Sequence, residues 1–318
     1  MATTEPIPLF VPTHTSVSDS PSDNPPPLTQ LGVNTPTASP NLPPGPTFTP
    51  WANDPPQGHI VYVCFIEGYD NLCLMNADGS NLQRLTTTTA TDFYPSLAPD
   101  GQQIVFSTRR DNNFEIYVMN IDGTGVRRLT ENAGSNYAPS FSPDGSKIVF
   151  SAYRGDRSDI WIMNNDGSGQ TQLTDTGGQN FDPEWSPDGA QISFASNRSG
   201  TVELFVMKAD GGDARQVTQG LNMGGRNDWS PDGQRLTFYA GEPGGRNIYV
   251  INLDGTGLQA VTDQSDNRGP SFSPDGNWIA FISYRDGNNE IYIAHPDGSG
   301  LTRLTNDPRP DWQPRWGP

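Results

Sequence analysis

The sequence has little positive charge and no cluster of basic residues. Its 318 residues include 19 Lys and Arg against 36 Asp and Glu, a formal net charge of -17. Nucleic acids and anionic membranes are bound by clustered positive charge, and no run of Lys and Arg occurs in this chain. We therefore expect neither partner, and attribute the acidity mainly to solubility and acidic turns rather than to an acidic functional surface.

Long apolar segments and cysteines are scarce as well. The longest apolar run, Ile60 to Ile66, has seven residues, whereas roughly 18 are needed to cross a bilayer. We expect no membrane insertion within this chain, and no secretory signal peptide can be read, because no Lys or Arg precedes the first apolar patch. The two cysteines, Cys64 and Cys73, are too few for a disulfide scaffold and lack the spacing of a structural zinc site.

Turn-forming residues are abundant, and hydrophobic residues make up only 33% of the chain. The 34 Gly and 30 Pro are unfavourable inside helices and strands, so the composition predicts an all-β protein with frequent turns. Residues 1–56 hold 15 of the prolines and no Lys or Arg. We expect this segment to be a disordered linker or stalk ahead of a folded domain at residues 57–318.

A repeat of about 44 residues organises the folded part. Asp-Gly pairs recur at spacings of 44, 44, 44, 44 and 43, and Pro-Asp-Gly triplets form a second, interleaved series. Each repeat holds four short strand patterns, which in the third repeat are residues 136–141, 147–152, 159–164 and 171–174. We call them strands A to D; four antiparallel strands in each repeat are typical of a β-propeller blade.

The ends of the chain indicate how the ring closes. Strands B, C and D occur six times, but only five complete junctions from strand A to strand B are present. The missing strand A matches the C-terminus, because Asp311-Trp-Gln-Pro-Arg-Trp316 resembles Asn180-Phe-Asp-Pro-Glu-Trp185. We predict a six-bladed β-propeller of four-stranded antiparallel blades in which the C-terminal strand completes blade 1.

The repeats resemble those of the TolB-type propeller family, within the broad WD-like class. The last repeat reads Phe272-Ser-Pro-Asp-Gly276, then Ile279-Ala-Phe281, Arg285-Asp-Gly287 and Glu290-Ile-Tyr292. The resemblance covers all six repeats and implies the propeller fold. TolB itself has an α/β domain where this chain has its Pro-rich segment, and similar repeats occur in ectodomains of bacterial membrane-bound kinases and ahead of prolyl-oligopeptidase hydrolase domains. The Pro-rich segment fits an ectodomain stalk best.

Catalytic motifs are absent. A serine hydrolase would need a Gly-x-Ser-x-Gly motif with a histidine partner, and no such pentapeptide occurs. The three histidines, His14, His59 and His295, lie in unrelated contexts. The acids recur in every repeat, as turn chemistry predicts, and Asn-x-Asp-Gly lacks the third oxygen position and the bidentate Glu of a calcium loop. We predict no catalytic residue, no metal site and no cofactor.

Four repeats have a basic residue after strand B and an acid at the start of strand C. These pairs are Arg110 and Glu115, Arg154 and Asp159, Arg198 and Glu203, and Arg285 and Glu290. We expect each pair to close its hairpin and fix the register. The same register one repeat earlier places Cys64 opposite Cys73. Because a disulfide between directly opposed residues is strained, we expect free thiols, with a disulfide as the alternative.

The repeats differ most at the start of strand A, the strand that surrounds the central channel of a propeller. The candidate partner-binding residues at this channel mouth are Asp92, Tyr137, Asn180, Phe181, Asp182, Arg226, Asn267, Arg268, Asp311 and Trp312. Their departure from sixfold symmetry suits an asymmetric ligand. The alternative is structural: the polar residues satisfy strand ends and the aromatic residues pack between blades.

These features favour a non-catalytic module that binds a protein or peptide, monomeric, and located in the periplasm or outside the cell. Arg226 and Arg268, in an otherwise acidic protein, favour an acidic or carboxylate-bearing segment as the ligand. The alternatives are a ligand-sensing or carbohydrate-binding ectodomain and an enzyme with a site at the channel mouth. Converging carboxylates in a deep pocket would favour the enzyme, whereas a narrow channel lined by small residues would favour the binding module.

Overall fold

The computed structural model describes residues 55–131, 134–175 and 178–318, and every regular element within them is a β-strand. The strands form six sheets of four antiparallel strands, as the repeat predicts. In this described part of the chain, no helix is long and apolar enough to cross a membrane. The predicted linker lies almost entirely outside the described residues, so its disorder stays a prediction.

Each sheet is one blade, and its strands follow one another from A, at the channel, to D, at the rim. Blade 1 consists of β24 (Asp311–Gly317), β1 (His59–Ile66), β2 (Tyr69–Asn76) and β3 (Gln83–Arg84), and blade 2 of β4 (Asp92–Leu97), β5 (Gln103–Asp111), β6 (Asn113–Asn120) and β7 (Arg127–Arg128). Blade 3 consists of β8 (Ser135–Phe141), β9 (Lys147–Arg154), β10 (Arg157–Asn164) and β11 (Thr171–Gln172), and blade 4 of β12 (Asn180–Trp185), β13 (Gln191–Ser196), β14 (Glu203–Lys208) and β15 (Arg215–Gln216). Blade 5 consists of β16 (Met223–Trp229), β17 (Arg235–Ala240), β18 (Asn247–Asn252) and β19 (Gln259–Ala260), and blade 6 of β20 (Asn267–Phe272), β21 (Ile279–Ser283), β22 (Glu290–Ala294) and β23 (Thr302–Arg303).

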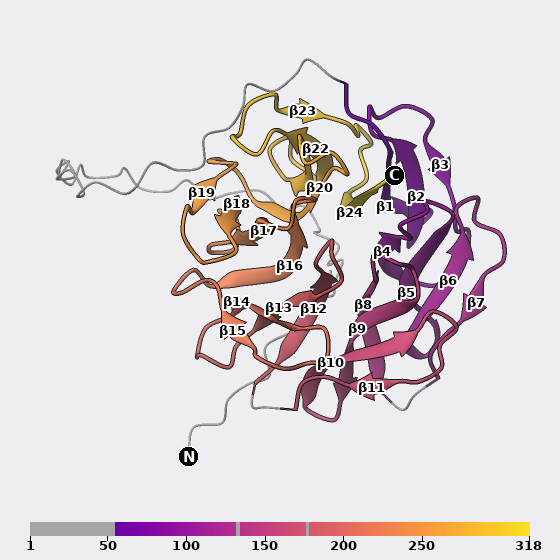
Figure 1. Ribbon diagram of the computed structural model, residues 1–318. Coiled ribbons are helices and arrows are strands. Elements are labelled where there is room, and N and C mark those ends of the chain that lie inside the picture. The colour runs from indigo at the N-terminus through magenta and orange to yellow at the C-terminus, as the bar shows by residue number, and fades with distance from the viewer. Residues whose placement is uncertain (1–54, 132–133, 176–177) are drawn as a thin grey trace, which may run out of the picture. The chain divides into compact units, whose positions relative to one another are not determined.

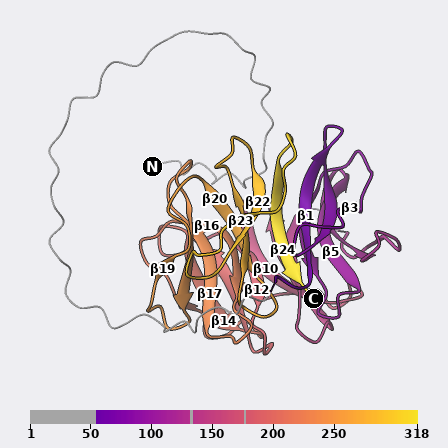
Figure 2. The same cartoon turned by 90° about the horizontal axis from the view of Figure 1, so that it is seen from above.

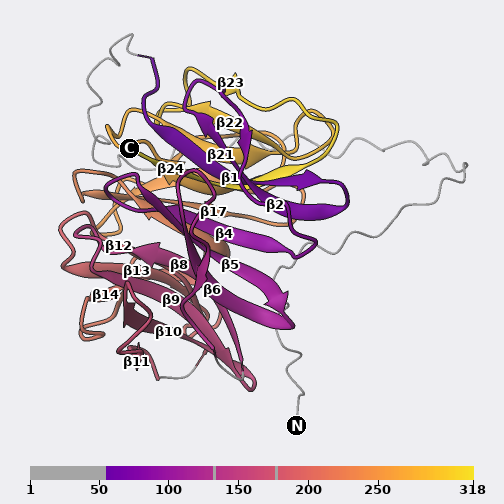
Figure 3. The same ribbon diagram turned by 90° about the vertical axis from the view of Figure 1, so that its right-hand side faces the viewer.

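The C-terminal strand closes the ring. Strand β24 pairs antiparallel with β1, so that Trp316 lies opposite Ile60. The six blades form a ring with their A strands innermost (Figure 1), around an axis that we call the channel, and β24 lies between β1 and the strands of blade 6 (Figure 2). Blade 2 packs between blades 1 and 3 (Figure 3). The predicted six-bladed fold and its closure are confirmed.

The hydrophobic core lies between the blades. Strand B is buried on both faces, as Val105 and Phe106 show with no exposed surface. Each blade contributes one large aromatic residue from the same position of strand B: Tyr62, Phe106, Phe150, Phe194, Phe238 and Phe281. Burial of such a side chain stabilises the fold by roughly 2–3 kcal/mol. The periodic sequence therefore specifies a periodic core.

The Asp-Gly turn between strands C and D also contributes to blade packing. Asp122 Oδ1 accepts hydrogen bonds from the backbone N of Thr124 at 3.0 Å and from its hydroxyl at 2.6 Å, and these bonds hold the pKa of Asp122 below its ordinary value. Gly123 has a φ of 82°, and a Cβ there would lie 2.7 Å from the Leu85 carbonyl oxygen of the preceding blade. The interpretation of this motif as a turn is confirmed.

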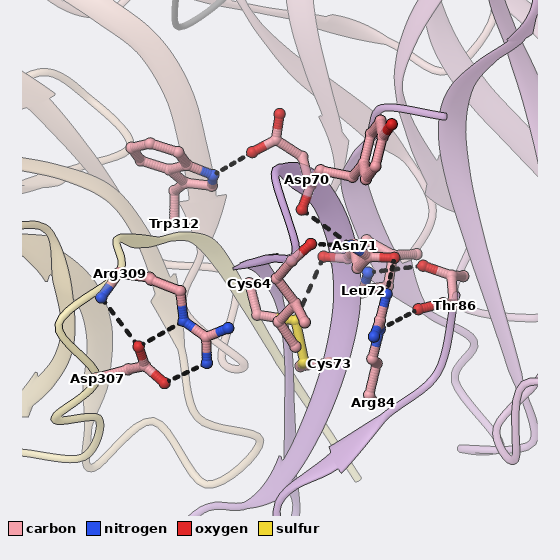
Figure 4. The surroundings of a disulfide bond; sticks show 12 residues. Cys64, Asp70, Asn71, Leu72, Cys73, Arg84, Thr86, Asp307, Arg309 and Trp312 are labelled. Carbon is pink, nitrogen blue, oxygen red and sulfur yellow. Dashed lines mark hydrogen bonds and ion pairs between the residues drawn. A yellow bond between two sulfur atoms is a disulfide. The ribbon is translucent and has the colours of Figure 1, made fainter. Parts of the chain in front are cut away.

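The two cysteines form a disulfide, which contradicts the expected free thiols. Tyr62, not Cys64, lies opposite Cys73, while Cys64 lies opposite Asn71. The cysteines are therefore diagonal neighbours on β1 and β2, with Cα atoms 5.9 Å apart, a normal separation for a disulfide (Figure 4). The prediction was wrong because it placed the two residues directly opposite each other.

Reduction of this disulfide should lower the melting temperature. Cys64 and Cys73 are 9 residues apart in the sequence, and closing a loop of this length stabilises the folded state by about 2–3 kcal/mol on chain-entropy grounds. Thermal unfolding with and without reductant measures the loss. A variant with both Cys64→Ser and Cys73→Ser should melt at the reduced temperature under both conditions. An equal wild-type melting temperature with and without reductant would contradict the prediction.

Candidate functional site

Strand A of every blade has a bulge near its start, and this bulge shapes the channel. In blade 2 the pairing with strand B shifts register between Phe93 and Ser96. In five blades the third residue, counted from Asp92 in blade 2 and from the aligned residues elsewhere, adopts a left-handed backbone, with φ of 54° at Tyr94 and 51° at Asp182. In blade 5 the positive φ, 119°, lies one residue earlier, at Gly225. A bulge redirects the side chain that it carries, and we infer that these third residues face the channel. The Oε1 atom of Gln313, another third residue, accepts a hydrogen bond from Tyr94 N at 2.7 Å.

One aligned position at the start of each A strand forms a ring that we call the junction ring, and positions along strand A are counted from it. Its members are Asp92, Asn136, Asn180, Gly224, Asn267 and Asp311. All of them except Gly224 are buried. Asn136 Nδ2 donates to Glu115 Oε2 at 2.7 Å and to Thr130 Oγ1 at 3.2 Å, both in the preceding blade. These residues satisfy strand ends at the contacts between blades. Four candidate binding residues, Asp92, Asn180, Asn267 and Asp311, thus support the mouth from within the protein.

The arginine after strand B does not pair with the acid of strand C, so the predicted hairpin pairs are wrong. Arg110 Nη2 instead lies 3.3 Å from Asp92 Oδ1, and its Cζ lies 4.8 Å from the centre of the Tyr117 ring. The acid Glu115 binds Arg128 of strand D at 3.2 Å. In the same way, Arg154, Arg198 and Arg285 donate to Asn136, Asn180 and Asn267. The arginine therefore contacts strand A, and the acid contacts strand D. The spacing of the two residues within one hairpin does not indicate these partners.

The second residues of the A strands bring aromatic and basic groups to the channel end at which these strands begin. They are Phe93, Tyr137, Phe181, Gly225, Arg268 and Trp312. Phe93 is buried, whereas Tyr137, Phe181, Arg268 and Trp312 are half-buried. Tyr137 packs against Phe114 with ring centres 5.0 Å apart, and Trp312 Nε1 donates to Asp70 Oδ1 at 3.3 Å (Figure 4). Four candidate binding residues therefore lie at this mouth, where they also take part in packing.

Blade 5 departs from the other blades at this mouth. Gly224 and Gly225 replace residues with side chains, and Tyr239 of β17 takes the space, with its hydroxyl donating to Gly224 O at 2.6 Å. A Cβ on Gly224 would lie 1.9 Å from the Tyr239 ring. Arg246 and Arg268 both bind Asp266, at 3.5 and 2.7 Å. Blade 5 and the start of blade 6 thus bring two guanidinium groups together at this mouth.

Arg226 crosses the channel from blade 5 to blade 2. Its Cζ lies 5.4 Å from the centre of the Tyr94 ring, and its Nε and Nη1 atoms are buried without a hydrogen-bond partner among the described residues. Burial lowers the pKa of Arg226 to about 10, with the charge of Arg315 adding to this effect and that of Asp182 opposing it. Burial also raises the pKa of Asp182, against the attraction of Arg226.

A second crossing, from blade 1 to blade 4, was not predicted from the sequence. Arg315 Nη2 binds Glu184 Oε2 at 2.5 Å, and Nη1 lies 3.5 Å from Asp228 Oδ2. Burial raises the pKa of Glu184, although Arg315 opposes this shift. These three residues occupy the fifth position of strand A, at which the other blades have Ser96, Ser140 and Ser271. This break in the repeat is the signal that could have identified them.

The channel interior therefore holds three carboxylates and two guanidinium groups: Asp182, Glu184 and Asp228, with Arg226 and Arg315. Ser140 donates to Glu184, and Ser271 donates to Asp228 at 2.9 Å. Carboxylates converge, as the enzyme alternative requires, but Glu184 and Asp228 are engaged by Arg315 and by serine hydroxyl groups. No group of three His, Cys, Asp or Glu side chains in the described ranges could hold a metal ion.

The family of the chain follows from a comparison with known sequence families. The model of the TolB beta propeller domain matches residues 124–227 and 219–318, which is more than half of the chain. The chain therefore belongs to the TolB beta-propeller family, as its repeats indicated. A comparison with curated proteins finds no match.

Solved structures share the fold with little sequence identity. TolB from Acinetobacter baumannii is 23% identical with a TM-score of 0.75, over 82% of this chain and 67% of that one. A putative TolB from Agrobacterium tumefaciens is 20% identical with a TM-score of 0.63, over 78% of this chain and 88% of that one. An oligogalacturonate lyase from Vibrio parahaemolyticus is 17% identical with a TM-score of 0.52, over 71% of this chain and 72% of that one. At these identities the likeness shows the fold and leaves the activity open.

Proposed function

We propose that this chain is a non-catalytic propeller that binds a protein or peptide partner at the channel mouth where the A strands begin. The observation that carries the proposal is that arginine side chains cross the channel and bind its carboxylates. Arg226 and Arg315 cross it to the opposite blades, and Arg315 binds Glu184 and Asp228. Carboxylates held in this way are poorly placed to move protons for a substrate, so the functional surface is the mouth.

The contact residues of the proposal are the half-buried side chains at the mouth: Tyr137, Phe181, Arg268 and Trp312. Aromatic residues and Arg are enriched in the centres of protein interfaces. The ligand chemistry follows from Arg268, a half-buried guanidinium group at the mouth of an otherwise acidic protein. An acidic or carboxylate-bearing segment complements this charge. In this proposal Asp182 and Arg226 lie deeper in the channel, beneath the contact residues.

The proposed location is the periplasm or the outside of the cell. The Cys64–Cys73 disulfide supports it, because such bonds persist in oxidising compartments and are rare in the cytosol. Residues 1–56 would then serve as a linker or stalk that presents a monomeric propeller, residues 57–318. Kinship with TolB propellers is consistent with this location.

The alternative is an enzyme or a sensor that binds a carbohydrate or another small ligand in the channel. It is favoured by Asp182 and Glu184, two half-buried carboxyl groups whose pKa values are raised by desolvation, a property common at active sites. A lyase also shares the fold. Titration with oligosaccharides distinguishes the two: binding or turnover that Asp182→Asn abolishes would establish the alternative in place of the peptide module.

Arg268→Ala should weaken partner binding about 10- to 100-fold, as expected for an interface arginine. The partner is first captured from a cell-envelope fraction on wild-type propeller, and its affinity is then measured for each variant. The melting temperature should change little, because Asp266 keeps Arg246 as an ion-pair partner at 3.5 Å. Arg226 is unsuitable for this test because it is buried, so its substitution would change both the affinity and the stability.

Lys147→Ala is the matched control, since Lys147 is exposed at the opposite end of its blade and should bind like wild type. If Arg268→Ala retains full affinity with an intact fold, the interface lies elsewhere on the propeller and this site is wrong.

A further inference from the structure

The contact between blades 6 and 1, where the ring closes, differs chemically from the other contacts. At three contacts the junction-ring asparagine donates to one aligned residue of strand C in the preceding blade: Asn136 to Glu115, Asn180 to Asp159 and Asn267 to Asn247. The pairs at these two aligned positions are Asn71 and Asp92, Glu115 and Asn136, Asp159 and Asn180, Glu203 and Gly224, Asn247 and Asn267, and Glu290 and Asp311. Only the closing contact combines two carboxyl groups. The other contacts have at most one acid, with an amide or a glycine opposite.

A near-identical contact between blades 2 and 3 shows what the second carboxyl group changes. Glu115 binds Arg128 at 3.2 Å and accepts a hydrogen bond from Thr130. Glu290 likewise binds Arg303 at 2.9 Å and accepts a bond from Thr305 at 2.6 Å. Each glutamate also accepts a bond from an asparagine two residues before it. The difference is the facing residue of strand A, Asn136 in one contact and Asp311 in the other.

The closing contact has fewer hydrogen-bond donors than the contact between blades 2 and 3. Asn136 Nδ2 supplies N–H groups to both Glu115 and Thr130. The single hydroxyl proton of Thr305 is given to Glu290, so an ionised Asp311 would add an acceptor where the amide adds a donor. Only a protonated carboxyl group can donate in its place.

Blade 1 also lacks the cation that four of the other blades place beside this position. Arg110, Arg154, Arg198 and Arg285 reach the junction ring in blades 2, 3, 4 and 6. The aligned residue of blade 1 is Ile66, which packs in the hydrophobic core. Asp311 is thus a buried carboxyl group, 4% exposed, without a guanidinium group of its own blade.

We propose that Asp311 closes the ring as a protonated carboxyl group that donates into the contact with Glu290 and Thr305, as the asparagines do at the other contacts, so that loss of its proton weakens the contact between blades 6 and 1. The inference is independent of the proposed function. It makes ring closure sensitive to pH at one contact, on the strand that completes the propeller.

The charged surroundings agree with this assignment. Burial raises the pKa of Asp311 to about 7, and the charges of Glu290 and Asp307 add to the shift, while Thr305 and Arg309 oppose it. Arg309 is bound to Asp307 at 2.7 Å (Figure 4). On the outer side, Arg303 lies between Glu290 and Asp286, at 2.9 and 3.1 Å. Toward blade 1 the titratable neighbour is the buried Tyr62, whose pKa is raised by burial and by Asp311.

The sign of the pH effect follows from the raised pKa. Because folded Asp311 holds its proton more tightly than the unfolded chain does, its contribution to stability is complete below a pH of about 4, the unfolded pKa. It is lost as the pH rises through about 7. The closing contact is therefore stronger in mildly acidic than in mildly alkaline solution.

The test compares melting temperatures of the full chain at pH 5 and pH 8. Asp311→Asn, which installs the residue found in three other blades, should raise the melting temperature by about 3 °C at pH 8 and change it little at pH 5. Glu290→Gln should likewise shrink the difference between the two pH values.

Glu115→Gln is the matched control, because its contact has the same Arg, Thr and Asn partners but faces Asn136. It should leave the wild-type difference between pH 5 and pH 8 unchanged. The proposal is overturned if Asp311→Asn shifts the melting temperature equally at both pH values. It is also overturned if Glu290→Gln and Glu115→Gln alter the pH difference to the same extent.

Discussion

Deleting residues 307–318 should unfold or aggregate the propeller. The deletion removes β24 and so leaves blade 1 without its inner strand and the ring with two open edges. It also removes Trp316, which is 8% exposed and packs with Ile60 and Tyr62 in the core between blades 6 and 1. Loss of a buried tryptophan alone costs about 3–5 kcal/mol, a large part of the roughly 5–15 kcal/mol that stabilises a typical domain.

Circular dichroism melting and size-exclusion chromatography measure this outcome. A synthetic peptide with the sequence of residues 307–318, added in trans, should restore part of the folded signal by pairing with β1. A scrambled peptide of the same composition is the control and should restore none. A soluble, monomeric truncation that melts like wild type would refute closure by the C-terminal strand.

Arg315→Met should destabilise the protein by about 3 kcal/mol at neutral pH, because it leaves Glu184 and Asp228, whose side chains are 13% and 17% exposed, without their cation. The loss should shrink at acidic pH. Burial already raises the pKa of Glu184 while Arg315 opposes the shift, so removing Arg315 raises it further. The folded state then favours the protonated carboxyl group, whose stabilising contribution is present at low pH and lost as the pH rises.

A double-mutant cycle with Glu184→Gln separates the ion pair from simple packing loss. Glu184→Gln with Arg315→Met should be more stable than Arg315→Met alone at neutral pH, because no uncompensated charge remains on Glu184. Unfolding in urea at pH 5 and pH 8 supplies the free energies. Additive effects of the two substitutions at both pH values would show that the pair across the channel does not contribute.

The sequence predicted those parts of the structure that depend on neighbouring strands in one repeat. The Asp-Gly turns and the aromatic position of strand B recur every 44 residues, and each depends on contacts that every repeat reproduces. The predicted partners of Arg110 and Glu115 were wrong for a related reason. Both residues lie in one hairpin, but their partners lie on the flanking strands A and D.

The structure separates the candidate binding residues into two groups, and their role in binding stays a prediction. Tyr137, Phe181, Arg268 and Trp312 reach the mouth. The polar residues beside them in the sequence, such as Asn180, turn into the contacts between blades, where they are fully buried. The alternation of side chains along a strand sends adjacent residues to opposite faces, but the sequence does not state which face meets the next blade.

By itself, the sequence determined the number of blades, their strands and turns, and the strand that closes the ring, because these features follow from local periodicity and from one unmatched strand. Only the tertiary structure decided what fills the channel. Glu184 and Arg315 are 131 residues apart in the chain and come together at 2.5 Å because blades 1 and 4 stand opposite each other in a closed ring of six. No repeat unit contains that contact, since it forms only when all six blades are in place.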